Sequence, residues 1–539
     1  MAAPQVLIVG AGPTGLVLAL RLARHGVPFR IVDRNAGPAQ ASRAMAVQAR
    51  TLEFYRQLGF ADAVVAAGIQ VEAAHVREGG HDVARVALAD MGVGLSPYPF
   101  VLCYPQDDHE RFLVGQLAAA GVAVEWGVEL TAFTQTDAGV RAVLDRGGTA
   151  ETCGVAYLCG CDGARSRVRE TLAVGFPGGT YDQLFYVADV KVAERVPDEL
   201  YMSLGDDAFA LMLPVRSSGT HRFIGVMPPG LAGRTDLTFE DVRPSAEALL
   251  GAHAAEVHWF STYRVHHRVA SHFRAGRSFL AGDAGHIHSP AGGQGMNTGI
   301  GDAVNLSWKL AHVLQGRAAP SLLDTYEPER IAFARTLVAT TDRVFTGVVG
   351  RGATGHLVRT WLVPHLLPLL AGFAAVRRAA FETVSQVRLS YHESALSAGR
   401  AGDVHGGDRL PWVAADGVDN FAPLGTLDWQ LHVYGSVSPA LGDGAAALGL
   451  AVHGFAWSGA AAAAGLQRDA AYLVRPDGYV ALASPEQDVG RLREFVAAHG
   501  LRFAGAPALT SHSHNGRLRL GATAPPLGED RVADEHLGR

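Results

Sequence analysis

The sequence predicts an α/β protein in which a parallel sheet is interrupted by an antiparallel sheet and followed by a smaller α/β domain. The apolar run Gln5–Val9 suits a strand buried on both faces; helical periodicity follows over residues 15–25, then a second strand at Phe29–Val32. Such a strand–helix–strand opening implies parallel pairing. Over residues 181–192 apolar side chains alternate, which indicates an antiparallel sheet with one covered face. A segment rich in Gly and Asp at 399–411 is typical of a linker.

The remaining elements follow in chain order. Three more strands of the central sheet are expected at Phe209–Val215, His221–Met227 and Val257–Val265. Helical periodicity returns over Met296–Leu314 and continues to about Leu396. In the last domain we expect three strands and one helix, at Gln430–Tyr434, Tyr472–Val474, Tyr479–Leu482 and Gly490–His499.

Composition excludes several classes of protein. Of the 539 residues, 48% are hydrophobic, which suits packed globular domains rather than a disordered chain. The net charge of −6 and the lack of a long basic run argue against nucleic acid as a partner. The four cysteines are too few for a disulfide scaffold and form no Cys-x-x-Cys pair, so we expect small buried thiols and no metal site.

Neither export nor a membrane span is expected. The N-terminus begins a strand within a few residues and lacks a basic leader, which favours a cytoplasmic protein. The longest apolar run, 361–376, is interrupted by two prolines and a histidine and is shorter than the ~20 residues that a spanning helix needs.

The first motif that carries chemistry is VGAGPTG at residues 9–15, between the first strand and its helix. Gly10 allows the tight turn, Gly12 lets a pyrophosphate approach the backbone, and Gly15 allows helix and strand to pack closely. The helix N-terminus supplies free N–H groups for the phosphates. Asp33, at the end of the second strand, is placed to accept hydrogen bonds from ribose hydroxyls, so the sequence predicts a dinucleotide site.

Two further glycine-rich motifs follow buried strands. Residues 160–169, GCDGARSRVR, put a sharp Asp162-Gly163 turn beside three arginines, although a solvated Asx-turn has the same pattern. Residues 276–302, GRSFLAGDAGHIHSPAGGQGMNTGIGD, end a strand at Asp283 and lead through a glycine-rich bend to another helix N-terminus. There a carboxylate can hold polyol hydroxyls, and bare backbone can contact a flat ring at the positive end of the helix dipole.

These three motifs, in this order and spacing, resemble the group A FAD-dependent aromatic hydroxylases, the phenol and aromatic polyketide monooxygenases. The resemblance covers roughly residues 4–395. It implies a Rossmann-type FAD-binding domain (1–75, 101–180 and 270–398), an interrupting antiparallel-sheet substrate domain (76–100 and 181–269) and, after the linker, a C-terminal thioredoxin-like domain (412–539). The tail sequence LVRPDGYV at 473–480 is similar to the family's closing hairpin.

The resemblance also implies cofactor-binding roles, carried over residue by residue. Residues 10–15 and Asp33 would hold the adenosine half of FAD, Arg43 would lie over the pyrophosphate, and Gln106 and Asp283 would contact the ribityl chain. Pro290 and residues 293–297 would line the isoalloxazine ring, and Asp162 would contact FAD and the nicotinamide cofactor. The full set of residues assigned to the cofactor is Gly10, Gly12, Pro13, Thr14, Gly15, Asp33, Arg34, Arg43, Gln106, Asp162, Asp283, Pro290, Gly293, Gln294, Gly295, Met296 and Asn297.

The chemistry that the resemblance implies is a single-component monooxygenase. NADPH or NADH, bound transiently, reduces non-covalent FAD, and O₂ then gives a flavin hydroperoxide that hydroxylates a phenolic or polycyclic aromatic substrate. No catalytic triad is expected. Candidates for a substrate-side base, by location alone, are Tyr201, His221, His258, Tyr263, His266 and His267.

Several alternatives stay open from the sequence. Baeyer–Villiger or oxidative ring-opening chemistry would use the same cofactor, and a flavin-binding sensor without turnover would carry the same motifs. A flavin-dependent halogenase would need a Trp-x-Trp signature. This class is excluded because no two of the seven tryptophans stand two positions apart. A monomer and a homodimer are equally compatible with the sequence.

Overall fold

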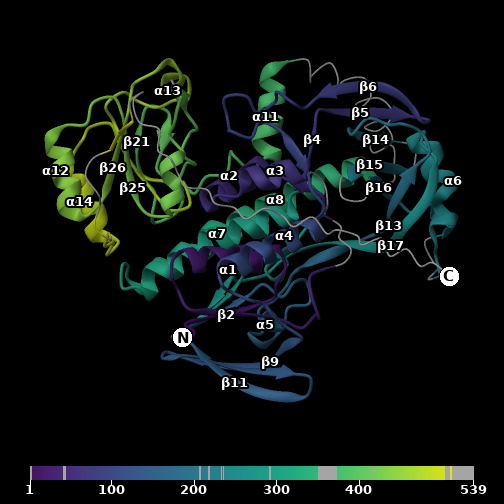
Figure 1. Cartoon of the computed structure of the whole chain (residues 1–539), viewed down its shortest axis with the longest axis horizontal. Coiled ribbons are helices and arrows are strands. Elements are labelled where there is room, and N and C mark those ends of the chain that lie inside the picture. Colours follow the sequence, from purple (N-terminus) through teal and green to yellow (C-terminus); the bar gives the residue numbers. More distant parts are fainter. Residues whose placement is uncertain are drawn as a thin grey trace, which may run out of the picture.

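The computed structural model describes residues 3–39, 44–204, 208–215, 219–231, 234, 236–289, 293–349, 373–415, 417–503, 505 and 510–512. Figure 1 shows a helix-covered sheet at the centre, a second large sheet to its right and a third α/β unit to its left. The three regions correspond to the parallel, antiparallel and C-terminal parts that the sequence predicts.

The central sheet has six strands in the order β18-β19-β12-β1-β2-β8, and all neighbours are parallel except the β18–β19 hairpin. Its strand–helix–strand opening is confirmed, with β1 fully buried. The bounds are β1 Val6–Val9, α1 Pro13–Arg24, β2 Phe29–Asp33, β8 Glu125–Trp126, β12 Tyr157–Gly160, β18 Arg274–Ala275 and β19 Ser278–Leu280.

Helices α1, α4 (Gln106–Ala119) and α7 (Gly295–Leu314) cover the central sheet, with α1 packed between the other two. Below it, as Figure 1 is drawn, lies a three-stranded antiparallel sheet of β9 (Val128–Thr136), β10 (Gly139–Arg146) and β11 (Thr149–Val155).

The second large sheet has eight strands in the order β20-β17-β13-β16-β15-β14-β5-β6. Every neighbouring pair is antiparallel except β14–β5, which is parallel. Their bounds are β5 Ala73–Glu78, β6 His81–Ala87, β13 Gly178–Val192, β14 Leu200–Leu204, β15 Phe209–Val215, β16 Thr220–Val226, β17 Ala254–Val269 and β20 His286–Ile287. The third glycine-rich motif therefore contributes the edge strand β20.

Both faces of this sheet are covered, whereas the alternation indicated one. Tyr186, Ala188 and Val190 pack beneath α6 (Phe239–Leu250), on the face that the sequence predicts to be covered. On the opposite face Val187 and Ile224 join a cluster with residues 45–103 of the flanking chain. We call this cluster the inner face; it consists of Met45, Ile69, Val71, Cys103, Val187, Leu213, Val215 and Ile224.

The C-terminal sheet has seven strands in the order β22-β21-β28-β27-β25-β26-β29. Strands β25 and β26 are parallel and joined by α12, whereas β27 and β28 form an antiparallel hairpin. The bounds are β21 Ala398–Ala401, β22 Val404–His405, β25 Gln430–Tyr434, α12 Pro439–Leu448, β26 Ala451–Phe455, α13 Gly459–Ala463, β27 Ala471–Val474, β28 Val480–Ser484, α14 Val489–Ala498 and β29 Thr510–His512.

The linker expected at 399–411 contains strands instead of free chain. β21 pairs with β28, and a Cβ on Gly399 would lie 2.2 Å from the Ala483 carbonyl oxygen. A Cβ on Gly406 would lie 2.2 Å from the Ala398 nitrogen. The glycines of this segment therefore reflect close backbone packing, which has the same composition as a flexible linker.

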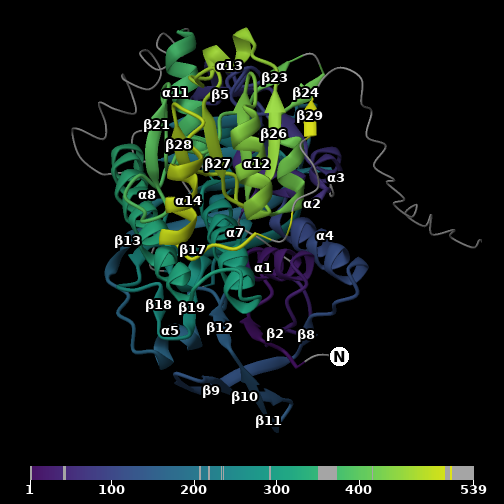
Figure 2. The ribbon, with the colours of Figure 1, turned by 90° about the vertical axis from the view of Figure 1, so that its left-hand side faces the viewer.

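Smaller elements complete the fold. In the described residues between α7 and the C-terminal sheet, helical structure is found in the 3₁₀ turn Pro320–Thr325, in α8 (Tyr326–Val349) and in α11 (Ala374–Val384), so its last helix ends before the expected Leu396. The other described elements are β3 Ala46–Val47, α2 Ala49–Leu58, α3 Ala61–Ala67, β4 Ile69–Val71, β7 Val101–Cys103, α5 Arg167–Thr171, β23 Ala414–Ala415, β24 Val418–Asp419 and three more short 3₁₀ turns. Figure 2 shows the C-terminal domain above α7 and α1.

The expected buried thiols are confirmed: all four cysteines are free and buried, and burial raises the pKa of Cys103 to about 12. Among the described residues no helix is both long and apolar enough to cross a lipid bilayer. The apolar run 361–376 lies largely outside the described residues.

Candidate functional site

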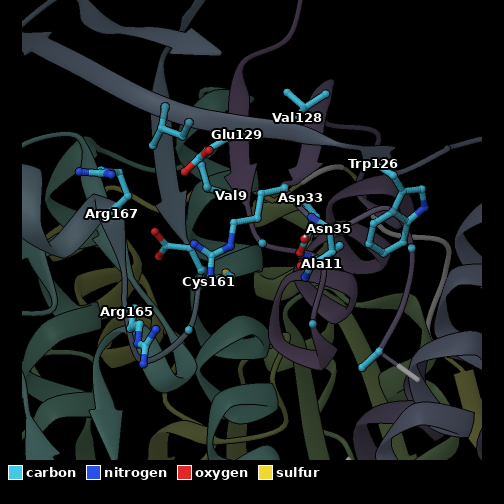
Figure 3. A pocket seen from close by; sticks show the side chains of 18 of the residues that line it. Val9, Ala11, Asp33, Asn35, Trp126, Val128, Glu129, Cys161, Arg165 and Arg167 are labelled. Carbon is cyan, nitrogen blue, oxygen red and sulfur yellow. Dashed lines mark hydrogen bonds between the residues drawn. The ribbon is translucent and has the colours of Figure 1, made fainter. Parts of the chain in front are cut away.

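A cavity of about 240 Å³ lies beyond the carboxyl ends of β1, β2 and β12 (Figure 3). This is the edge of a parallel sheet where ligands bind in open α/β folds. The cavity brings together the first motif, the end of β2 and the Asp162 turn, with β8 and β9 as its outer wall. Two of the three motifs thus share one site.

The three glycines of the first motif have different roles. Gly10 has a φ of +103°, and a Cβ there would lie 2.2 Å from the Cys161 carbonyl oxygen. A Cβ on Gly15 would lie 2.0 Å from the Gly10 carbonyl oxygen. A Cβ on Gly12 would meet nothing within 4 Å. Gly10 and Gly15 are therefore required by the fold itself, whereas Gly12 leaves open space on the cavity side.

Asp33 lies in the cavity and also holds the turn. Its Oδ2 accepts a hydrogen bond of 2.7 Å from the Ala11 nitrogen, and its Oδ1 accepts one of 2.8 Å from the Asn35 nitrogen. Arg34 lies beside it, exposed at the cavity wall. The sequence indicated a ribose ligand at Asp33 but not this second role in bracing the glycine turn.

Asp162 lines the same cavity and has one side-chain oxygen without a partner. Its Oδ2 accepts a hydrogen bond of 3.1 Å from the Val168 nitrogen, while Oδ1 is buried without a partner. Burial raises the pKa of this carboxyl. Buried polar atoms are normally paired, so this oxygen indicates a place where a ligand or water donates a hydrogen bond.

Arg169, from the second motif, ties that motif to the third. Its guanidinium donates to the Ala284 carbonyl oxygen at 3.0 Å and to the Ala164 carbonyl oxygen at 2.9 Å. Arg165 and Arg167, by contrast, are exposed and line the cavity.

The first and third motifs meet at Thr14. A Cβ on Gly282 would lie 2.5 Å from Thr14 Oγ1, and one on Gly299 would lie 2.4 Å from the same atom. Pro13 is buried at the start of α1. Asp283 is exposed on the turn that begins at Gly282, beside the bend.

A buried charge cluster fixes the bend against α7. Asp302 accepts hydrogen bonds from the Gly282 nitrogen at 2.9 Å and from Arg330 Nε at 2.6 Å, and its Oδ2 lies 2.7 Å from His286 Nε2. Although burial alone would raise the pKa of Asp302, Arg330 and His286 hold it below its ordinary value. The sequence placed Asp302 at the end of the motif without assigning it this role.

Two residues expected to line the ring use their side chains elsewhere. Asn297 Oδ1 accepts from the Gln48 nitrogen at 2.9 Å, and its Nδ2 donates to the Ala46 carbonyl oxygen at 2.9 Å. Gln294 Nε2 donates to the Val384 carbonyl oxygen at 2.6 Å. Both side chains therefore hold the loop in place, which leaves the backbone of residues 293–297 as the surface available to a flat ligand.

The other assigned residues are placed as follows. Gly293 and Gly295 are half-buried, and Met296 packs against the main core. Gln106 Nε2 donates to Glu110 Oε1 at 2.8 Å. Arg43 and Pro290 lie outside the described residues.

The proposed substrate-side groups lie on different faces of the eight-stranded sheet. Tyr263 packs against the inner face, whereas Tyr201 belongs to the opposite core beneath α6. His221 stands two positions before Phe223 in β16, so its side chain points to the same face, the α6 side. His258 is exposed, and His266 pairs with Thr180.

Sequence reasoning missed an ion pair on the inner face. Arg222, buried in β16, forms two hydrogen bonds of 2.7 and 2.8 Å with Asp189 of the adjacent strand β13. The guanidinium lies 5.7 Å from the centre of the Trp259 ring. In the sequence, a buried arginine in an alternating strand cannot be told from an exposed one. The pairing is revealed by the register of β13 and β16, which places Asp189 opposite Arg222.

The chain is similar to flavin-dependent enzymes in both sequence and structure. Residues 3–341 match the model of a family described as an FAD binding domain. The 6-methylpretetramide 4-monooxygenase of Streptomyces rimosus is 39% identical over 75% of this chain and 73% of its own. The solved flavin-dependent monooxygenase PieE, in complex with FAD and substrate, has a TM-score of 0.77 at 28% identity, over 92% of this chain and 99% of its own.

One relative has a different printed activity. The dialkyldecalin synthase of Streptomyces rugosporus is 30% identical over 89% of this chain and 96% of its own. The match of the family model over most of the chain, together with these relatives, fixes the family. The chain belongs to the FAD-binding family that contains the flavin-dependent aromatic monooxygenases.

Proposed function

We propose that the protein is an NAD(P)H-dependent monooxygenase that hydroxylates a phenolic or polycyclic aromatic substrate with O₂ and non-covalently bound FAD. The observation that supports it most directly is the cavity that joins Gly12, Asp33 and Asp162 at the end of the parallel sheet. The remaining support comes from relatives named as monooxygenases of aromatic compounds.

The residues present fit FAD. Gly12 leaves room for a diphosphate beside the N-terminus of α1, and Asp33 provides carboxylate oxygens at the cavity wall. Asp162 Oδ1 is buried and unpaired, so it can accept a hydrogen bond from the bound group. Asp283 is exposed beside the bend and would hold the ribityl hydroxyls. The backbone of residues 293–297 would contact the ring system at the positive end of α7.

FAD supplies the redox and oxygen chemistry, and the protein supplies binding, orientation and exclusion of water. The inner face is a buried apolar cluster that includes Val187 and Ile224, and we propose that it forms one side of the substrate site. Such a surface favours a flat apolar substrate and keeps water away from the reacting atoms. Tyr263 and the Arg222–Asp189 pair lie on this side of the sheet and are polar. We propose that Tyr263 orients a substrate hydroxyl and that Arg222 favours its ionised form.

A second candidate is cyclisation without net oxidation. It is favoured by the synthase relative, which matches over 96% of its own length. Baeyer–Villiger insertion and oxidative ring opening remain outcomes of the same assay, because they would consume O₂ and NAD(P)H as hydroxylation does. A sensor would bind FAD without substrate-dependent turnover.

The test combines flavin titration with rapid kinetics. The purified protein is expected to take up FAD, which acid or heat should release into the supernatant because no covalent bond holds it. Anaerobic reduction by NADPH or NADH is then followed with and without phenols and fused-ring quinones. We expect one class of compound to accelerate reduction and to gain one oxygen atom in air.

Each contrary result has a distinct meaning. A protein that takes up no flavin contradicts the cofactor assignment. A product of unchanged mass, formed without O₂, replaces hydroxylation by cyclisation. FAD binding with no compound that accelerates reduction favours the sensor.

The same proposal includes finer features of the whole protein. We propose a cytoplasmic enzyme, monomeric or homodimeric, with domain boundaries as the sequence predicts apart from the strands at 398–405. We also propose that residues 412–539 form a thioredoxin-like domain, supported by the parallel β25–α12–β26 unit and the β27–β28 hairpin. This domain contains no cysteine, so a dithiol role is excluded.

A further inference from the structure

Three side chains with metal-binding donor atoms converge where the flavin-binding part of the chain passes into the C-terminal sheet. They are His392, in the turns between α11 and β21, His405 in β22, and Asp408. His392 Nε2 lies 2.7 Å from Asp408 Oδ1, and His405 Nδ1 lies 3.6 Å from Asp408 Oδ2. The donor atoms all lie within 4.8 Å of one another.

The backbone holds these three positions before any ligand arrives. The Tyr391 nitrogen donates to the Gly407 carbonyl oxygen at 2.8 Å, and the His405 nitrogen donates to Asp408 Oδ2 at 2.8 Å. A Cβ on Gly407, whose φ is +97°, would lie 2.6 Å from the Tyr391 carbonyl carbon, so the two segments pack directly against each other. Binding at such a site would cost little ordering of the main chain.

The donor set selects the class of ion. Two imidazole nitrogens and one carboxylate suit Zn²⁺ and its transition-metal neighbours, whereas Ca²⁺ and Mg²⁺ prefer all-oxygen sites. Around a tetrahedral Zn²⁺, ligand atoms stand about 3.3 Å apart, given Zn–N and Zn–O bonds of about 2.0–2.2 Å. His392 Nε2 and Asp408 Oδ1 now lie 2.7 Å apart, so they would move apart by roughly half an ångström to bind the ion.

The exposure of the ligands permits that movement. The His392 side chain is 50% exposed, so it can rotate outward without disturbing the core. Arg409, the nearest cation in sequence, does not compete, because its guanidinium is buried and donates two hydrogen bonds to Glu53. Water would complete the coordination shell on the open side.

We propose that His392, His405 and Asp408 bind one Zn²⁺ or a similar transition-metal ion, and that the ion fastens the chain after α11 to the first hairpin of the C-terminal sheet. The site lies outside the flavin cavity and takes no part in its chemistry. The neighbouring residue connects the site to the glycine-rich bend of the third motif, because Arg330 donates to Tyr391 Oη at 2.8 Å and also to Asp302 at that bend.

The experiment uses the full-length, tag-free protein with FAD bound and all metals removed by chelation. Zn²⁺ is titrated against a chromogenic chelator, and thermal unfolding is recorded with and without the ion. We expect one equivalent to bind tightly and to raise the unfolding midpoint, because an ion that binds only the folded state stabilises it.

Variants identify the ligands. His392→Ala and His405→Ala should each weaken Zn²⁺ binding by more than about tenfold and remove the thermal shift. The matched control is His253→Ala, which removes another exposed histidine that pairs with a carboxylate, Glu194, but belongs to no close group of three metal-binding donors in the described part of the chain. That variant should bind Zn²⁺ as the wild type does.

Two results would overturn the proposal. Failure of the wild type to take up Zn²⁺ in competition with the chelator would leave the three residues as a hydrogen-bonded surface cluster. Alternatively, His392→Ala and His405→Ala could retain FAD and circular dichroism and still bind one equivalent, which would place the ion elsewhere. Both variants replace partly exposed side chains, so retained FAD serves as the check on folding.

Discussion

At the scale of single residues, glycine is used in two ways that mutation can separate. Gly12 has an ordinary φ of −73° and space for a Cβ, whereas a Cβ on Gly15 would meet the Gly10 carbonyl oxygen. Gly12→Ala should therefore leave the stability of the flavin-free protein unchanged and weaken FAD binding by about tenfold or more, since its methyl group would occupy ligand space. Gly15→Ala should lower the unfolding midpoint even without FAD. Equal effects of both variants on the flavin-free protein would contradict this separation.

Asp283 carries the second prediction at this scale. Its exposed carboxylate has the position expected for holding ribityl hydroxyls, and hydrogen bonds to a charged group contribute about 1.5–3 kcal/mol each. Asp283→Ala should thus weaken FAD binding by about tenfold to a hundredfold, measured by quenching of flavin fluorescence. The control is Asp443→Ala, which removes an exposed aspartate from α12 in the C-terminal domain. Undiminished FAD affinity in Asp283→Ala would refute the assignment.

At the scale of elements, the position of α7 depends on the buried pair of Asp302 and Arg330. Removing one partner of a buried ion pair leaves an uncompensated charge and costs about 3–5 kcal/mol. Asp302→Asn should lower the free energy of unfolding by about that amount, and Arg330→Met should do the same. The double variant should lose less than the sum of the two, as measured by urea unfolding. Strictly additive losses would show that the two side chains do not stabilise each other.

At the scale of the whole molecule, the domains are joined by buried charges rather than by an apolar seam alone. Arg475, in the β27–β28 hairpin, donates to both oxygens of Glu329 at 2.8 and 2.9 Å, and Asp477 accepts from Trp308 Nε1 at 3.1 Å. Likewise, both carboxylate oxygens of Glu53 accept hydrogen bonds from the Arg409 guanidinium. Although burial alone would raise the pKa values of Glu53 and Glu329, the paired cations hold them below 4.5.

This arrangement predicts the acid stability of the protein. Carboxyls whose pKa is depressed by folding contribute stability that is complete above their unfolded values of 4.5 for Glu and 3.8 for Asp. Below those values the unfolded chain binds more protons, so the free energy of unfolding should fall progressively as the pH drops. Urea midpoints measured from pH 6 down to about pH 3 test this, with buffer ionic strength held constant. Stability that rises across the same range would contradict the paired state of these carboxyls.

The sequence predicts the parts of the structure whose signals are local. The β1–α1–β2 opening, the alternation on β13 and the start of α7 depend on neighbouring residues, and each lies within a few residues of its predicted place. The roles of Asp302 and Asn297 depend on partners hundreds of positions away or on other elements, which no local pattern encodes. Arg475 and Glu329 are 146 residues apart, and as isolated charged residues they resemble surface positions. The strand β21 was missed for the related reason that glycine is equally typical of linkers and of tightly packed strands.

Thr14 stands between Gly282 and Gly299, and this has a consequence for building chimeric proteins. The side chain occupies space that both glycines leave free, so the three positions form one unit contributed by segments far apart in the chain. Exchanging the N-terminal segment with that of a relative carrying a larger residue at this place would force the bend and α7 apart, however well the individual pieces fold. A hybrid that takes Thr14, Gly282 and Gly299 from the same parent should keep this packing. Its crossover points should therefore leave all three positions with one parent.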